Sequence, residues 1–105
     1  MSRFISIAKV DHVPPGTCVT VEALGVHIAL FNVDGTFYAT DNTCPHAGGP
    51  LGEGTLIGNI VTCPWHGWRF NVCTGERPEN HDFKVSSCEV RIEGGEVQIA
   101  VPIKF

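Results

Sequence analysis

Two short stretches of the sequence each carry one cysteine and one histidine, and together they set the strongest constraint on the fold. Cys44-Pro45-His46 forms the first, and Cys63-Pro64-Trp65-His66 forms the second. The chain between them, residues 47–62, is long enough for a strand excursion that returns the second stretch beside the first. We therefore expect two neighbouring loops whose two thiolates and two imidazoles converge on one site.

The rest of the chain shows short runs of β-forming residues separated by turns. Twelve Gly and seven Pro supply the turns, and Asp34-Gly35 between two such runs is a strong hairpin signal. Helical periodicity extends over no more than a turn or two. The pattern predicts an all-β, antiparallel domain with loops at 44–54 and 63–67. The expected strands are 4–8, 18–21, 26–31, 37–40, 60–62, 68–72, 84–92 and 97–101.

Length, charge and cysteine content narrow the function classes. A chain of 105 residues predicts a single domain, 1–105. The formal charge of −4, with seven scattered Lys and Arg, argues against nucleic acid and anionic membranes as partners. We see no signal-peptide or membrane-spanning run and expect a cytoplasmic location. Five cysteines without a secretion signal favour a metal or redox role over a disulfide scaffold.

The donor set itself indicates which metal to expect. Two imidazoles in place of two thiolates make an iron-sulfur cluster less negative, so it accepts an electron more easily. A structural zinc site uses the same donors, but it usually pairs Cys with Cys and His with His. The mixed pairs favour iron-sulfur, and zinc stays as the alternative.

The two stretches resemble the signature of the Rieske family, Cys-x-His followed by Cys-x-x-His. Loop-forming residues also match, at Pro45, Gly48, Pro64 and Gly67. The resemblance implies a Rieske-like antiparallel β-sandwich with a small cluster-binding subdomain of two ligand loops, at about 43–70. It also implies one Rieske-type 2Fe-2S cluster and no catalytic residue. By the resemblance, Cys44 and Cys63 bind the buried iron, whereas His46 and His66 bind the outer iron.

Features around the loops indicate the kind of Rieske protein. Respiratory members add a cysteine to each loop and form a disulfide brace, whereas this sequence has Gly49 and Trp65 at those positions. Those members also carry Ser and Tyr hydroxyls that donate to sulfur, where this chain has Trp68 and Phe70. Without these donors the reduced cluster is less stabilised. We expect a potential near the low end of the Rieske range, about −150 mV.

The segment 70–75, Phe-Asn-Val-Cys-Thr-Gly, resembles ferredoxins of bacterial ring-hydroxylating dioxygenase systems. This resemblance implies a soluble, monomeric electron-transfer protein rather than an enzyme, working in aromatic hydrocarbon catabolism. It would shuttle single electrons from a flavin-dependent ferredoxin reductase to a terminal aromatic-ring oxygenase, docking transiently near His46 and His66. The alternatives are the small Rieske subunit of an assimilatory nitrite reductase and a zinc-stabilised interaction module.

Other candidate residues receive simpler interpretations. We expect Cys73 to be a small buried residue at a hairpin, and Cys18 and Cys88 to be buried within strands. The charged segment 76–82 is expected to be a solvated loop. Trp65 and Trp68 flank His66 and serve either packing or partner docking. The histidines without companion ligands, and therefore outside the cluster site, are His12, His27 and His81.

Overall fold

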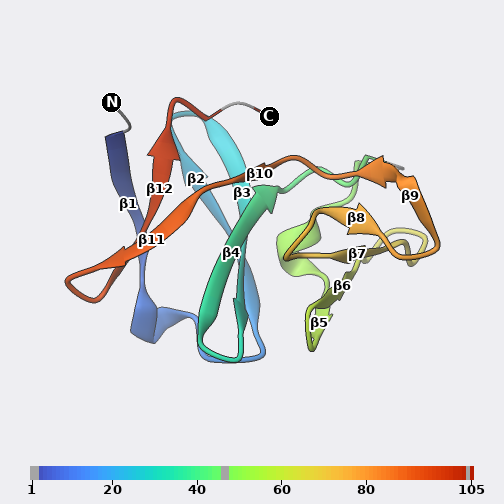
Figure 1. The fold of residues 1–105 in the computed structure, drawn as a ribbon, viewed down its shortest axis with the longest axis horizontal. Coiled ribbons are helices and arrows are strands. Elements are labelled where there is room, and N and C mark those ends of the chain that lie inside the picture. Colours follow the sequence, from blue (N-terminus) through green and yellow to red (C-terminus); the bar gives the residue numbers. More distant parts are fainter. Residues whose placement is uncertain (1–2, 46–47, 104) are drawn as a thin grey trace.

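Antiparallel sheets dominate the computed structural model, which describes residues 3–45, 48–103 and 105. One sheet has the order β1 (Arg3–Lys9), β12 (Glu96–Val101), β11 (Val90–Glu93). A second has the order β10 (Ser87–Cys88), β4 (Thr36–Asp41), β3 (Val26–Val33), β2 (Cys18–Ala23). In Figure 1 these two sheets form one side of the molecule, with both chain ends.

A smaller lobe lies on the other side of Figure 1. It contains the sheet β5 (Thr55–Ile57), β6 (Ile60–Thr62), β7 (Arg69–Asn71) and the hairpin β8 (Glu76–Arg77), β9 (Asn80–Lys84). The described residues also form two 3-10 turns, η1 (Val10–His12) and η2 (Leu51–Glu53). The expected all-β, antiparallel fold is confirmed.

Strand β3 connects the two halves because both of its faces are buried. Ile28 and Leu30 point into a core shared with Val97 and Ile99 of β12. Alternate residues on the opposite face belong to a second core, which includes Phe31. Successive side chains of a strand point to opposite faces, so a continuous apolar run suits this position. The second core also contains Cys44, Cys63 and Phe70, and thus fastens the small lobe to the sandwich.

The segment 76–82 differs from the expected solvated loop, because most of it forms the hairpin β8–β9. Its strands carry charged residues rather than an apolar alternation, and ion pairs hold them in place. The Arg69 guanidinium lies 2.6 Å from the Glu79 carboxylate, and Lys84 lies 3.9 Å from Glu76. Strand β5 was also absent from the expected set.

The expectation of a buried Cys73 was wrong, since this residue is exposed in the turn after β7. Its turn is stabilised by the Asn71 side chain, which accepts the Cys73 N–H at 2.9 Å. Cys18 and Cys88 lie in strands and are half-buried. Burial raises the pKa of the Cys88 thiol to about 11. Burial also raises the pKa of the Cys18 thiol. Neither thiol is therefore a reactive thiolate at neutral pH.

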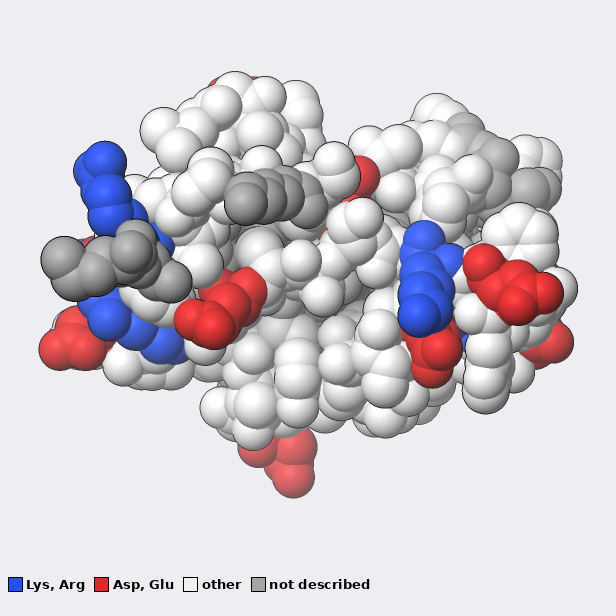
Figure 2. Space-filling view, turned by 45° about the horizontal axis from the view of Figure 1, so that its top comes forward, with Lys and Arg blue, Asp and Glu red and all other residues white. Residues whose placement is uncertain are grey.

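Surface charge is spread rather than gathered. On the face shown in Figure 2, acidic and basic side chains alternate with uncharged surface. The histidines without companion ligands, His12, His27 and His81, are exposed. Within the described part of the chain, no helix is long and apolar enough to cross a membrane.

Candidate metal centre

The two cysteine-bearing loops are closed in the same way. The Cys44 N–H donates to the Gly49 carbonyl at 2.9 Å, and the Cys63 N–H donates to the Trp68 carbonyl at 2.7 Å. In both loops the acceptor follows the cysteine by five residues. The flanking residues also pair, Thr43 with Pro50 and Thr62 with Arg69. Each loop is therefore the tip of a short antiparallel pair that fixes its cysteine at the start.

Asn42 ties both ends of the first loop to the sandwich. Its backbone carbonyl accepts the Leu51 N–H at 2.8 Å, and its side-chain oxygen accepts the Gly52 N–H at 2.8 Å. The same Oδ1 accepts the Thr20 hydroxyl of β2 at 3.0 Å. Asn42 is buried, so these hydrogen bonds are shielded from water. The two ends of the loop between residues 43 and 50 are thus held by one residue, Asn42, through its backbone carbonyl and its side chain.

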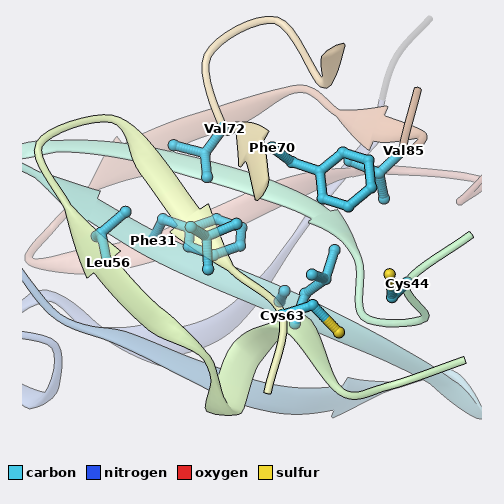
Figure 3. Close-up of a cluster of buried hydrophobic side chains, with 10 residues drawn as sticks. Phe31, Cys44, Leu56, Cys63, Phe70, Val72 and Val85 are labelled. Carbon is cyan, nitrogen blue, oxygen red and sulfur yellow. The ribbon is translucent and has the colours of Figure 1, made fainter. Parts of the chain in front are cut away.

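The thiols of Cys44 and Cys63 meet in the second core. The residues are 1% and 2% exposed, and both lie at one end of the group of apolar side chains in Figure 3. Burial is the largest influence on the Cys63 thiol and raises its pKa. The Trp65 N–H, which donates to the Cys63 sulfur, lowers this pKa, whereas a hydrogen bond with the Cys44 thiol raises it. The net shift is upward, so Cys63 keeps its proton at neutral pH until a metal replaces it.

Gly49 and Trp65, which stand where a disulfide brace is found in respiratory members, are in contact across the loops. A Cβ placed on Gly49 would lie 2.8 Å from Cys63 Sγ and 2.8 Å from Trp65 Cγ. Real atoms do not approach so closely, so only glycine fits here. The two loops are thus in contact through packing of Trp65 on Gly49.

The second loop carries its histidine at the surface in an unusual backbone conformation. His66 has a φ of 68° and Gly67 a φ of 72°. A left-handed conformation is uncommon for a residue other than Gly and is costly enough to need support from the surroundings. Residues 64–67 are all exposed, and the Trp65 N–H donates to Cys63 Sγ at 3.4 Å. The strained turn points to a functional constraint on His66.

The structure brings together only part of the predicted donor set. Cys44 and Cys63 are in contact, and His66 lies on the same loop as Cys63. His46 lies outside the described residues. Among the residues described, no three His, Cys, Asp or Glu side chains gather into a single metal site. The buried cysteine pair, beside a loop that carries His66, matches part of the donor set of a Rieske centre, in which cysteines would hold one iron and histidines the other.

Sequence reasoning missed Asn42 as a positioning residue. Its place two residues before Cys44, at the end of a strand, was the available signal, because Asn commonly bonds to backbone groups at turns. The second partner of that network, Thr20, is distant in sequence and left no signal.

Comparisons with known proteins agree with this geometry. The family model of the Rieske [2Fe-2S] domain matches residues 3–89. The ferredoxin component of naphthalene 1,2-dioxygenase/salicylate 5-hydroxylase systems of a Ralstonia species is 39% identical over 100 residues, covering 92% of this chain and 94% of that protein. Ferredoxin CarAc of Metapseudomonas resinovorans is 38% identical, covering 92% of each chain.

A solved structure gives the same result in three dimensions. A chain from the complex of reduced oxygenase and oxidized ferredoxin in carbazole 1,9a-dioxygenase has a TM-score of 0.86 and 36% identity. The match covers 97% of this chain and 96% of that one.

With its two cysteine-bearing loops on a β-sandwich, the chain belongs to the Rieske [2Fe-2S] domain family. Its cofactor is accordingly a Rieske-type 2Fe-2S cluster, as the resemblance in the sequence implied. The alternative of a zinc module is not supported.

Replacing Gly49 by Ala tests the contact between the loops. The added methyl group would press on Cys63 Sγ and on the indole, and overpacking of this kind costs about 1–3 kcal/mol. We expect Gly49→Ala to take up much less iron during reconstitution, as measured by iron per chain and visible absorption. Gly48→Ala is the control in the same loop, because no described atom lies within 4 Å of its Cβ position. Its φ of +78° adds about 1–2 kcal/mol of strain only. Equal iron content in the two variants would contradict the contact.

Substitution of Asn42 tests whether its side-chain hydrogen bonds hold the ends of the first loop. Asn42→Leu leaves the Gly52 N–H and the Thr20 hydroxyl without their acceptor, at about 1–3 kcal/mol for the buried groups. We expect lower unfolding stability and faster cluster loss, measured by thermal unfolding and by bleaching in the presence of an iron chelator. Asn42→Asp keeps the acceptor oxygens and should retain most of the stability. The interpretation fails if Asp and Leu behave alike.

Proposed function

We propose that this protein is the ferredoxin of a bacterial aromatic-ring dioxygenase system and carries single electrons. It would accept them from a flavin-dependent ferredoxin reductase and deliver them to a terminal oxygenase. The observation that carries the proposal is a buried cysteine pair beneath an exposed histidine loop, in a domain 39% identical to such a ferredoxin component. The relatives reported above support a carrier rather than a nitrite reductase subunit.

In this proposal Cys44 and Cys63 hold the inner iron, and His46 and His66 hold the outer iron. A bound 2Fe-2S cluster supplies a centre that takes up and releases one electron. The buried thiolates exclude water from one side, whereas the exposed loop 64–67 keeps the path from the outer iron to a docked protein short. The cluster-binding part is then about 43–70 of a single domain, 1–105.

A low reduction potential follows from the residues after the second loop. Phe70 is fully buried in the apolar core and has no hydroxyl to donate to a sulfur. Trp68 packs against the same core and brings an indole where respiratory members have a hydroxyl. With fewer donors aimed at the sulfurs, the reduced state is stabilised less.

Docking would take place over the exposed second loop. Trp65 is 51% exposed although it contacts Gly49, and aromatic side chains are common in protein interfaces. A carrier that alternates between a reductase and an oxygenase needs small, short-lived contacts. We propose that it does so as a monomer in the cytoplasm, using the surface around His46 and His66.

The ligand assignment is tested by Cys63→Ser, with Cys73→Ser as the matched control. Cys63 contacts Cys44 in the core, whereas Cys73 is exposed and outside the proposed ligand set. We expect Cys63→Ser to lose the visible absorption and to take up no electron in a reductive titration. Cys73→Ser should bind the cluster and accept one electron per chain. A Cys63→Ser protein with an unchanged spectrum would exclude Cys63 as a ligand.

The midpoint potential tests the role of the protein as a low-potential carrier. We expect a value near the low end of the Rieske range, about −150 mV, because the hydroxyl donors are missing. Spectroelectrochemical titration of the purified protein gives this value directly. A value near the upper end, about +300 mV, would contradict the assignment to the oxygenase ferredoxins.

A further inference from the structure

The ring of Trp68 contacts two side chains of the β8–β9 hairpin, Arg77 and Phe83. The Arg77 guanidinium carbon lies 3.7 Å from the centroid of the ring. Phe83 meets Trp68 edge-on, with centroids 5.1 Å apart and an interplanar angle of 82°. Both distances are within the range of attractive cation–π and aromatic contacts. The hairpin thus contacts Trp68, the residue whose carbonyl closes the second ligand loop.

Arg77 is oriented by this stacking more than by hydrogen bonds. Its side chain is 22% exposed, so its guanidinium is largely shielded from water. Its buried Nε has no hydrogen-bond partner among the described residues, and it lies 3.9 Å from a carboxylate oxygen of Glu79. Glu79 is engaged by Arg69, whose Nε donates to it at 2.7 Å. The face of Trp68 is therefore the main partner of Arg77.

Trp68 is linked to the proposed metal centre through its backbone. Its carbonyl accepts the Cys63 N–H at 2.7 Å, and this hydrogen bond closes the loop that contains His66. Gly49 closes the first loop, and the indole of Trp65 packs against its backbone. The first loop is therefore supported by packing of Trp65 on Gly49. The second loop is supported by the contacts of Arg77 and Phe83 with the Trp68 ring.

We propose that Arg77 is a positioning residue of the metal centre, which acts through the Trp68 ring to hold the loop of Cys63 and His66. The proposal rests on the ligand assignment above. Arg77 is far from both cysteines in sequence and touches neither loop through its own backbone pairing, which is with Asn80. Its effect on the centre therefore depends on the side chain stacked on Trp68.

The protein offers a closely matched control. Arg91 also stacks on an aromatic ring, with its guanidinium carbon 4.2 Å from the centroid of Phe4. That pair lies on the β1-β12-β11 sheet, away from the small lobe. Arg77→Met and Arg91→Met each remove one positive charge and one cation–π contact. Arg91→Met also removes the hydrogen bond from Arg91 Nε to Gln98 Oε1 at 2.8 Å, so the control loses at least as many contacts at a site away from the centre.

The experiment compares purified cluster-loaded variants by chelator-induced bleaching and by electron paramagnetic resonance of the reduced protein. We expect Arg77→Met to lose the cluster about five- to tenfold faster than wild type, the factor that a partly desolvated cation–π contact supplies. We also expect a change in the g values, which report the geometry at the histidine-bound iron. Arg77→Lys, which keeps a cation over the ring, should recover at least half of the lost lifetime. Arg91→Met should match wild type in both measurements.

A double substitution tests whether Trp68 is the intermediary. Trp68→Leu removes the ring and keeps the carbonyl that accepts the Cys63 N–H. In this background Arg77→Met should change neither the bleaching rate nor the g values further, because the stacked partner is gone. An undiminished effect of Arg77→Met in the Trp68→Leu background would overturn the proposal, as would wild-type behaviour of Arg77→Met alone. If Arg77→Met does not fold, the test uses Arg77→Lys and Trp68→Leu instead. The proposal is then overturned if both of these variants have wild-type g values and a wild-type bleaching rate.

Failure of the ligand assignment gives a different result. In that case Cys63→Ser retains the visible spectrum, and the wild-type protein lacks the signal of a Rieske centre. If Cys63→Ser loses the spectrum while Arg77→Met equals Arg91→Met, the ligands are right and only the positioning role of Arg77 is wrong.

Discussion

The meeting of Cys44 and Cys63 in the second core is the contact on which the rest of the small lobe depends. Two loops that start far apart in sequence must each deliver a buried thiol to one point. Each loop is closed by the N–H of its cysteine and a carbonyl five residues later. Because both loops use the same closure, a modest number of hydrogen bonds fixes both sulfurs without a disulfide.

The sandwich supports this meeting through β3, which is buried on both faces. One face belongs to the core of the two larger sheets, and the other carries Phe31 into the core that contains both cysteines. Asn42, at the end of the neighbouring strand β4, fastens the ends of the first loop to β2 and η2. The hairpin β8–β9 reaches the second loop through Trp68. Rigid sheets thus hold the second loop, whose tip is open to solvent at His66.

The sequence predicted the fold class and the position of both loops because short β-rich runs and Gly-rich turns are local signals. The Rieske family was also predicted, since the Cys and His spacing is encoded within each loop. The hairpin at 76–84 was not predicted, because ion pairs and contacts with Trp68 stabilise it rather than an apolar alternation. Cys73 was placed in the interior by the average behaviour of cysteine, whereas its Asn71-capped turn exposes it. The roles of Asn42 and Arg77 arise from contacts across the fold and leave no periodic signal.

We propose that two cysteines and two histidines of these loops hold one 2Fe-2S cluster. Pulsed electron paramagnetic resonance of the reduced protein, with histidine labelled by nitrogen-15, tests it most directly. We expect hyperfine couplings from two inequivalent histidine nitrogens, and the loss of one of them in His66→Cys protein that still carries a cluster. A reduced wild-type protein without any histidine nitrogen coupling would contradict it.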